Sequence, residues 1–285
     1  METITIRPLS DAVGAVIGGV DLRQLSDAEF SAIKSAFHQH GAIFFRNQSL
    51  DPDDHIAFAK RWGDININRF FHPVEGHPEI AEVLKSETDT LNIGGAWHTD
   101  HSYDQIPALG SILKAIDVPE VGGDTLFAGM SAAYDALSDG FKDMLGDLSA
   151  EHGNAHVFGP SSTANANPDA PRTGGRIGNP EAAGQEAIHP VVIAHPDTGR
   201  PGLYVNPGFT TGIVGWNRAE SDMLLHYLYN HIAQPRFTAR FHWEPGSVAM
   251  WDNRSTWHNA LNDYQGRRRY MHRITVEGVP ITSAA

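Results

Sequence analysis

Short strand-like segments separated by glycine and proline make up most of this chain from residue 79 onward, and no other feature restricts the fold as much. Helical periodicity interrupts them only at 131–148 and 219–232. The 28 glycines and 17 prolines among 285 residues are typical of a loop-rich β or mixed protein, and not of a coiled coil or a disordered chain. We therefore expect a single domain over 1–285, mainly β with flanking helices.

The N-terminal part of the chain carries two helix signals. Ser26-Asp27-Ala28-Glu29 is a capping box, and the helix that it opens is predicted to end at Gly41. Asp51 followed by Pro52 opens a second helix, which is predicted to end at Gly63. The strands expected from apolar runs and alternating patterns are residues 3–8, 14–22, 42–45, 109–113, 236–243, 247–251 and 268–276.

The composition excludes several classes of partner and site. The formal net charge of −13 would repel a nucleic-acid backbone, and the one dense basic run is only Arg267-Arg268-Arg269. The chain has no cysteine, so a metal must be held by histidine and carboxylate. No apolar window approaches the ~20 residues of a membrane span, and the N-terminus lacks a signal-peptide pattern. We expect a cytoplasmic homo-oligomer, a dimer or tetramer, that binds a small molecule and neither nucleic acid nor membrane.

Two His-X-Asp triplets occur, and their contexts differ. His195-Pro196-Asp197 lies between two apolar runs and continues into Thr-Gly, which predicts a hairpin turn. No turn signal surrounds His98-Thr99-Asp100. Together with His258, that triplet offers two imidazoles and a carboxylate, which can occupy one face of a ferrous ion and leave the opposite face open to oxygen. Without further motifs, a surface polar pair and a buried core histidine are the alternatives.

Further motifs, in the same order along the chain, agree with one known family. They are Trp97-His98-Thr99-Asp100, Gly122-Gly123-Asp124-Thr125, Trp251-Asp252-Asn253-Arg254, His258 and Arg269-Tyr270-Met271-His272-Arg273. In these motifs, and over nearly its whole length, the chain resembles the taurine/2,4-D dioxygenase family of Fe(II)- and 2-oxoglutarate-dependent dioxygenases. The resemblance implies a double-stranded β-helix, or jelly roll, with iron at its mouth.

The resemblance also implies a role for each matched residue. His98, Asp100 and His258 would bind Fe(2+), and Thr125 and Arg269 would bind the distal carboxylate of the co-substrate 2-oxoglutarate. On the sequence alone, Thr125 is a strand residue after a Gly-Gly-Asp turn. The implied reaction uses O2 to hydroxylate a C–H bond of a small anionic substrate, and it is coupled to decarboxylation of 2-oxoglutarate to succinate and CO2.

Two arginines lie four residues apart in the last predicted strand. Because side chains alternate between the faces of a strand, Arg269 and Arg273 point the same way, about 13 Å apart. A guanidinium suits a carboxylate because it donates two parallel hydrogen bonds. Arg273 matches a second family arginine, which lies near the iron and meets an anionic substrate in the sulfonate-using members. Solvated charges on an edge strand are the alternative.

Four positions depart from the taurine-using members of the family. Asn68 stands where they place a sulfonate-binding histidine, and Phe71 stands at a tyrosine position. Ile93 and Gly94 replace polar residues that bind the taurine amine. We expect Asn68 and Phe71 to contact the substrate, together with Arg273. The predicted substrate is therefore a small carboxylate or sulfonate that is more apolar than taurine.

Two further features border the predicted site. His101 follows the metal triplet, and since a facial triad needs its other positions free, we expect it either to support the metal ligands from behind or to face the substrate. The stretch 159–187 is rich in Pro, Ser, Ala, Asn and Gly with hardly any apolar periodicity, which predicts a mobile lid. A non-catalytic jelly-roll binder of a small organic acid and a cupin-like metal hydrolase are the alternative functions, and neither needs an anchor for 2-oxoglutarate.

Overall fold

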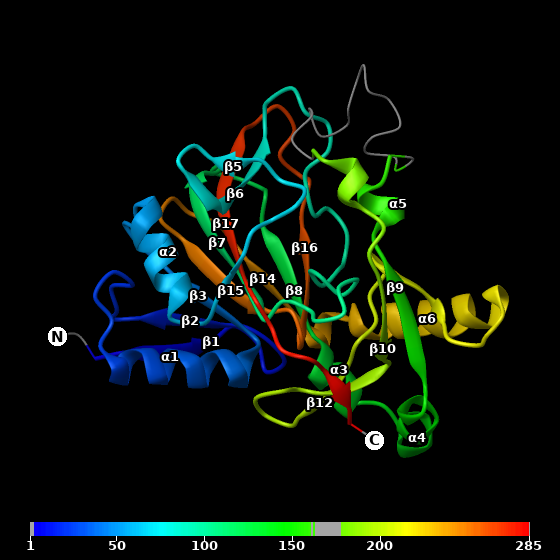
Figure 1. Ribbon diagram of the computed structural model, residues 1–285. Helices are drawn as coiled ribbons and strands as arrows, with labels where there is room; N and C mark the ends of the chain where they lie inside the picture. Colours follow the sequence, from blue (N-terminus) through cyan, green and yellow to red (C-terminus); the bar gives the residue numbers. More distant parts are fainter. Residues whose placement is uncertain (1–2, 161, 163–177, 285) are drawn as a thin grey trace.

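The computed structural model describes residues 3–160, 162 and 178–284 (Figure 1). Its helices are α1 (Asp27–His40), α2 (Pro52–Lys60), α3 (Met130–Asp135), α4 (Asp139–Gly146), α5 (Ala155–Phe158) and α6 (Arg218–Ile232), with 3-10 helices η1 (Pro180–Ala182) and η2 (Pro235–Phe237). Its strands are β1 (Thr5–Pro8), β2 (Ala15–Gly18), β3 (Ala42–Phe45), β4 (Ile65–Asn66), β5 (Pro73–Val74), β6 (His77–Lys85), β7 (Gly110–Asp117), β8 (Thr125–Gly129), β9 (Ser149–Gly153), β10 (Glu186–Pro190), β11 (Val192–Ala194), β12 (Pro201–Leu203), β13 (Thr210–Ile213), β14 (Thr238–Phe241), β15 (Val248–Asp252), β16 (Thr256–Ala260), β17 (Arg269–Val276) and β18 (Thr282–Ser283).

Two sheets enclose the core that carries the site. A nine-stranded sheet has the order β1-β2-β3-β15-β7-β17-β6-β5, with β4 also paired to β17, and a three-stranded sheet has the order β14-β8-β16. Phe44 of the large sheet packs edge-on against Phe127 and stacks on Phe241 of the small sheet, with ring centroids 5.2 and 4.2 Å apart. The chain therefore has the predicted mainly β jelly roll with flanking helices.

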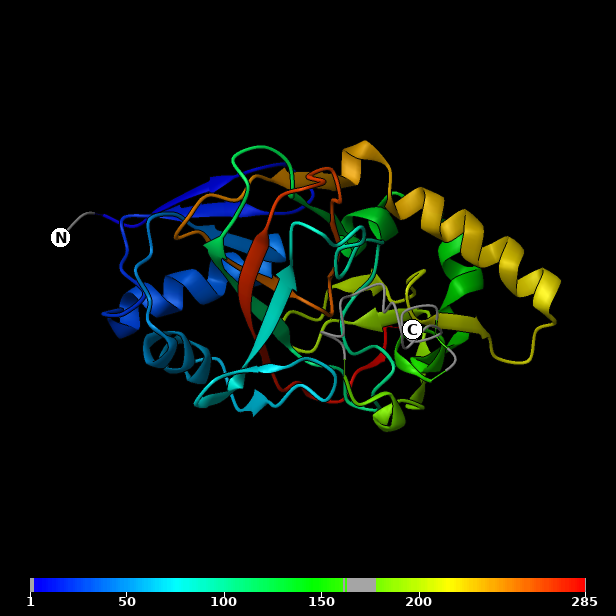
Figure 2. The same ribbon diagram turned by 90° about the horizontal axis from the view of Figure 1, so that it is seen from above.

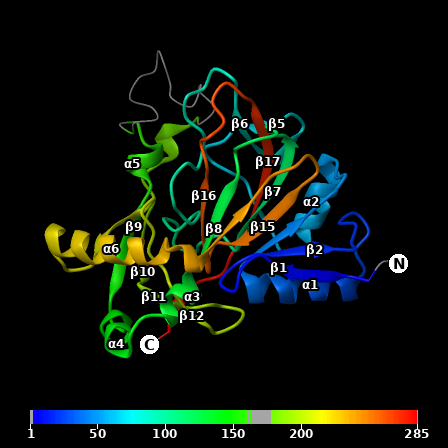
Figure 3. The same cartoon turned by 180° about the vertical axis from the view of Figure 1, so that it is seen from behind.

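Helices cover the outside of this double layer. The apolar side chains of α1 and α2 pack on the outer face of the large sheet, where Phe37 and Phe58 are buried. Helix α6 lies on the opposite side of the molecule from α1 (Figures 1 and 3), over the small sheets β10-β9-β13 and β12-β11-β18. None of the helices in the described residues is long and apolar enough to cross a membrane.

The predicted helices and strands are present, and several of their ends differ from the prediction, among them β2, which ends at Gly18, and β7, which runs to Asp117. The capping box of α1 forms as expected, and the helix ends at Gly41 with a φ of 68°. Helix α2 ends at Lys60, before the predicted Gly63. The helix predicted over 131–148 is two helices, because the backbone of Ser138 is extended (φ −67°, ψ 153°) and begins α4 anew.

Strand β17 lies inside the large sheet, where it pairs with β6 on one edge and with β7 on the other. Figure 2 shows β17 beside β6 from above. Its two arginines are therefore buried and are not solvated charges on an edge strand.

The predicted lid lies mostly outside the described residues, because 161 and 163–177 belong to it. Where the described chain resumes, Gly178 N donates to Phe70 O (2.8 Å) and Asn179 Nδ2 donates to Arg69 O (3.2 Å). The end of this stretch thus lies against the loop between β4 and β5, which carries Asn68.

Candidate functional site

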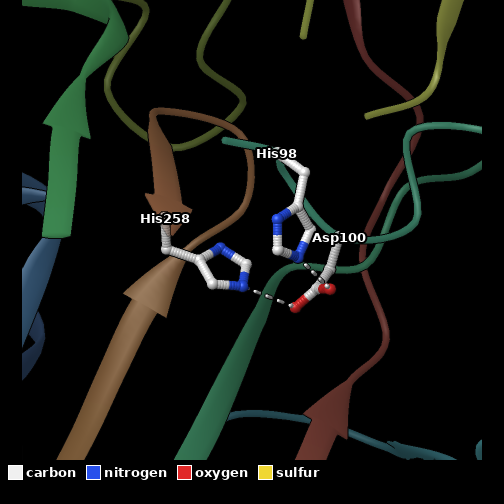
Figure 4. A group of neighbouring side chains, drawn as sticks. All are labelled: His98, Asp100 and His258. Carbon is white, nitrogen blue, oxygen red and sulfur yellow. Dashed lines mark ion pairs between the residues drawn. The ribbon is translucent and has the colours of Figure 1, made fainter. Parts of the chain in front are cut away.

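His98, Asp100 and His258 converge at one point of the fold (Figure 4). The first two lie in the loop between β6 and β7, and His258 lies on β16. Backbone hydrogen bonds tie the loop to the strand, from His98 N to His258 O (3.1 Å) and from His258 N to His98 O (2.8 Å). One nitrogen of each imidazole and one carboxylate oxygen lie within 4.8 Å of one another.

Hydrogen bonding fixes the tautomer of His98. Its Nδ1 lies 2.7 Å from the carbonyl oxygen of Ala96, which can only accept, so Nδ1 carries the proton. Nε2 therefore has a free lone pair, and it lies 3.7 Å from Asp100 Oδ1. His258 Nε2 lies 3.8 Å from Asp100 Oδ2. Two imidazole nitrogens and one carboxylate oxygen on one side of a point are the donor set that suits ferrous iron.

The carboxylate of Asp100 is held in its charged form. Burial on its own would raise the pKa of Asp100, but the positive charge of Arg273 and the neighbouring imidazoles hold that pKa well below its usual range. Ser111 Oγ donates to Asp100 Oδ2 (2.9 Å), and Arg273 Nη1 lies 3.3 and 3.5 Å from the two carboxylate oxygens. Asp100 is thus an oriented anion, as a metal ligand must be.

The three residues line a cavity of about 390 Å³. Most of the other residues predicted from the sequence line the same cavity, namely Asn68, Phe71, Ile93, Gly94, Thr125, Arg269 and Arg273. Segments that are far apart in the sequence are therefore brought together as expected.

Arg269 and Thr125 form one end of this cavity. Arg269 Nε donates to Gly123 O (3.2 Å), and its Nη2 is buried without a hydrogen-bond partner among the described residues. Burial lowers the pKa of Arg269. Gly123 has a φ of 72°, and a Cβ there would lie 3.3 Å from Arg269 Cδ, so the Gly-Gly pair makes room for the arginine. A buried guanidinium with an unused donor is prepared for an anion.

Arg273 and Phe71 lie near the metal residues. The guanidinium carbon of Arg273 is 4.9 Å from the centroid of the Phe71 ring, and Arg273 Nε is buried without a partner among the described residues. Asn68 Oδ1 accepts from Phe70 N (2.9 Å) and Phe71 N (3.0 Å). The Asn68 carbonyl therefore shapes the loop, and only its NH2 group is left for a substrate.

An aromatic wall of this cavity was not predicted. Tyr103, Phe158 and Phe209 line the cavity, and the Tyr103 ring centroid is 4.8 Å from that of Phe209 and 6.2 Å from that of Phe158. The three residues come from separate loops and a short helix. No sequence pattern links them, although Tyr103 follows the metal triplet closely.

Of the two expectations for His101, the substrate-facing one is not supported by the structure. It is not among the described residues that line the cavity, and its Nδ1 lies 2.8 Å from Asp104 Oδ2. The cause is its left-handed backbone, with a φ of 59°, which turns the side chain away from the direction expected for an extended segment. The placement gives His101 a role in fixing the loop rather than a substrate contact.

Comparisons with known proteins agree with this geometry. The chain matches a family model described as "Taurine catabolism dioxygenase TauD, TfdA family" over residues 5–275. It is 32% identical over 281 residues to the "Alpha-ketoglutarate-dependent sulfate ester dioxygenase" of Pseudomonas putida, with 98% of this chain and 91% of the relative covered. It is 31% identical over 286 residues to the "(S)-phenoxypropionate/alpha-ketoglutarate-dioxygenase" of Sphingobium herbicidovorans, with 98% and 97% covered. A solved "Taurine Dioxygenase from Burkholderia xenovorans" has a TM-score of 0.82 and 34% identity, with 98% and 93% covered.

Proposed function

The chain belongs to the taurine catabolism dioxygenase TauD, TfdA family, and on this basis we propose that His98, Asp100 and His258 hold the ferrous ion of its active site. The protein is a 2-oxoglutarate-dependent dioxygenase that acts on an anionic substrate, in line with its sulfate ester and phenoxypropionate relatives. The observation that carries the metal assignment is the approach of two imidazole nitrogens and one carboxylate oxygen to within 4.8 Å of one another.

Two imidazole nitrogens and one carboxylate oxygen are donors that suit Fe(II). A ferrous ion bound there supplies oxygen activation, coupled to decarboxylation of 2-oxoglutarate to succinate and CO2 and to hydroxylation of a substrate C–H bond. The protein itself contributes orientation. The Ala96 carbonyl keeps the lone pair of His98 Nε2 free, and Ser111 and Arg273 fix the Asp100 carboxylate.

We assign the distal carboxylate of 2-oxoglutarate to Arg269 and Thr125. The unpaired Nη2 of Arg269 supports this assignment, since a buried guanidinium donor without a partner costs free energy that a carboxylate would recover. The lining of the cavity is mostly apolar, which strengthens the attraction between Arg269 and that carboxylate.

We propose a small sulfonate or carboxylate with an apolar portion as the primary substrate. Arg273 would meet the anionic group, because its Nε has no partner among the described residues and its contact with Asp100 is long, at 3.3 Å. The apolar portion would lie against Phe71, Tyr103 and Phe209, which line the same cavity. A zwitterion as small as taurine leaves this wall uncovered and should bind poorly.

Oxygen uptake that depends on 2-oxoglutarate tests the proposal. We expect succinate release with Fe(II), 2-oxoglutarate and a panel of small sulfonates, sulfate esters and aryloxy acids, and little release with taurine. A non-catalytic binder or a metal hydrolase would show no such uptake. Preference for a neutral or cationic compound would contradict the role of Arg273.

Paired titrations then separate the two arginines. Arg273→Ala should raise the KM of the preferred substrate far more than that of the co-substrate, because the substrate loses the charged partner proposed for it while Arg269 still anchors 2-oxoglutarate. The matched control is Arg268→Ala immediately before β17, where Arg268 pairs with Asp117 (2.6 Å) and is partly exposed. Equal changes in both KM values would overturn the assignment.

A further inference from the structure

We propose that Trp243 sets the direction of the Thr125 hydroxyl and so makes Thr125 a hydrogen-bond donor to the distal carboxylate of 2-oxoglutarate. The inference rests on the proposed function, which assigns that carboxylate to Thr125 and Arg269. Trp243 follows β14 and is buried. It belongs to none of the motifs that identify the family.

The direction of one hydrogen bond carries the argument. Trp243 Nε1 lies 2.9 Å from Thr125 Oγ1. An indole N–H can only donate, whereas a threonine hydroxyl has one proton to donate and two lone pairs to accept. Thr125 must therefore accept from Trp243, and its own proton must point elsewhere.

The proton of the Thr125 hydroxyl can point into the cavity. Among the described residues, no hydrogen bond has Thr125 Oγ1 as its donor, and Thr125 lines the cavity beside Arg269. Both side chains are buried, since Thr125 is 3% exposed and Trp243 is 2% exposed. A buried hydroxyl proton without a protein acceptor favours a ligand that can accept, such as a carboxylate.

Trp243 also contacts the second group of the anchor. The guanidinium carbon of Arg269 lies 5.6 Å from the centroid of the Trp243 ring, within the distance at which a cation and an aromatic face attract. The indole thus supports both residues, with its N–H at Thr125 and its ring at Arg269. Phe241 holds the ring edge-on, with centroids 5.0 Å apart and planes at 85°.

The two contacts can be separated by substitution. Trp243→Phe keeps an aromatic face near Arg269 and removes the N–H, and Thr125→Val removes the hydroxyl at nearly constant volume. We would measure binding of 2-oxoglutarate by calorimetry with Zn(II) in place of Fe(II), so that no turnover occurs. The comparison ligand is 2-oxovalerate, which chelates a metal in the same way and lacks the distal carboxylate.

Thr125→Val should bind 2-oxoglutarate about 10- to 150-fold more weakly, the range for a hydrogen bond to a charged group, and Trp243→Phe about 3- to 10-fold more weakly, the range for a neutral hydrogen bond. The double variant should bind it no more than about 2-fold more weakly than Thr125→Val alone, because the N–H acts only through the hydroxyl. Binding of 2-oxovalerate should be unchanged in all three. Additive losses, or equal losses for both ligands, would overturn the proposal.

Trp257→Phe is the matched control. Trp257 is also fully buried and donates from Nε1 to Val205 O (2.9 Å), away from Thr125. Its removal should lower stability to a similar degree and leave 2-oxoglutarate binding unchanged. If the wild-type protein binds 2-oxoglutarate no better than 2-oxovalerate, the proposed co-substrate site itself is wrong, whatever Trp243→Phe does.

A measurement on the unaltered protein avoids any question of folding. In protein with 15N-labelled tryptophan, 2-oxoglutarate should shift the indole N–H resonance of Trp243, and 2-oxovalerate should leave it nearly in place. The resonance of Trp257 should respond to neither ligand. If the Trp243 resonance did not shift with 2-oxoglutarate while calorimetry showed binding, the proposed link from Trp243 through Thr125 to the carboxylate would be refuted.

Discussion

The two His-X-Asp triplets of this chain differ in how many ring nitrogens of their histidines already have a hydrogen-bond partner. Both ring nitrogens of His195 are used, since Nε2 lies 2.9 Å from Asp252 Oδ2 and Nδ1 accepts from the backbone of Asp197 (3.2 Å). His98 has only its Nδ1 engaged, and its Nε2 faces a cavity. The same residue types therefore form a closed structural cluster in one region and an open ligand set in the other.

The buried arginines of the two regions repeat this contrast. Arg254, beside His195, pairs with both oxygens of Asp252 (2.8 Å each) and with Asp197 (2.8 Å). In the cavity, Arg273 approaches Asp100 only to 3.3 Å, and Arg269 has an Nη2 without a partner among the described residues. Short, complete pairing indicates a structural role, and incomplete pairing in a cavity indicates a place for a ligand.

The largest expected effect is loss of activity without loss of the fold. His98→Ala, Asp100→Ala and His258→Ala should each abolish turnover, because too few donors are left to hold the metal. Iron content after dialysis and the circular dichroism spectrum would be measured side by side. His195→Ala is the control, and it should retain iron. Full activity in any of the three ligand variants would show that the open triplet is not the metal site.

The second prediction concerns the closed cluster. Asp252→Ala should lower the free energy of unfolding by about 3–5 kcal/mol, because it leaves Arg254 buried with half of its charge pairing removed. The remaining folded protein should bind iron normally. Denaturant unfolding monitored by fluorescence gives the stability. If Asp252→Ala lowered the free energy of unfolding by less than about 1 kcal/mol, the pairing of Asp252 with Arg254 would not have the structural role that distinguishes this region from the cavity.

The convergence of His98, Asp100 and His258 and the shared face of the two arginines could be expected from the sequence for specific reasons. His98, Asp100 and His258 are chemically distinctive, and their motifs separate them from the second triplet. The common face of Arg269 and Arg273 follows from the two-residue period of a strand, and both side chains line the cavity. The shared face of the arginines is a local property, whereas the association of His258 with His98 and Asp100 was implied by the family resemblance.

Other parts of the site depend on contacts that no local pattern encodes. Tyr103, Phe158 and Phe209 meet only because three distant segments pack together. The sequence could not decide between the two expectations for His101, because its left-handed backbone is uncommon for a residue other than glycine. Trp243 was missed for a related reason, since its partner Thr125 lies more than a hundred residues earlier.

The third prediction compares Arg269, whose Nη2 has no partner among the described residues, with Arg254, which is fully paired with carboxylates. Arg269→Ala should raise the 2-oxoglutarate requirement between tens- and thousands-fold, as expected when ~2–5 kcal/mol is lost from a buried charge pair. Its effect on stability should be small, because Arg269 has no carboxylate partner in the described part of the chain. Arg254→Ala should do the reverse and destabilise the fold. An Arg269→Ala protein with unchanged 2-oxoglutarate dependence would show that the anchor lies elsewhere.

The smallest effect concerns a histidine of the scaffold, His55 on α2. Burial lowers the pKa of His55 to about 3, with the positive charge of Lys114 adding to the effect. The folded protein therefore keeps His55 neutral, while the unfolded chain binds a proton near pH 6.5, so stability is lost as pH falls through this window. Between pH 6 and pH 5 the loss from this one residue is about 1 kcal/mol, at most 1.36 kcal/mol per pH unit.

His55→Leu should remove that loss and make the acid limb of the stability curve shallower, as measured by denaturant unfolding of metal-free protein at both pH values. His152, whose pKa burial also lowers to about 3, stays in place, so part of the slope should persist. Asp252 does not contribute to the slope between pH 6 and pH 5. Burial alone would raise the pKa of Asp252, but the charge of Arg254 outweighs burial and lowers it. The stability that the charged Asp252 contributes is therefore lost only below the unfolded carboxyl pKa of about 3.9. An unchanged slope in His55→Leu would mean that the unfolded chain does not gain the proton there, and that this buried imidazole contributes nothing to the acid sensitivity of the scaffold.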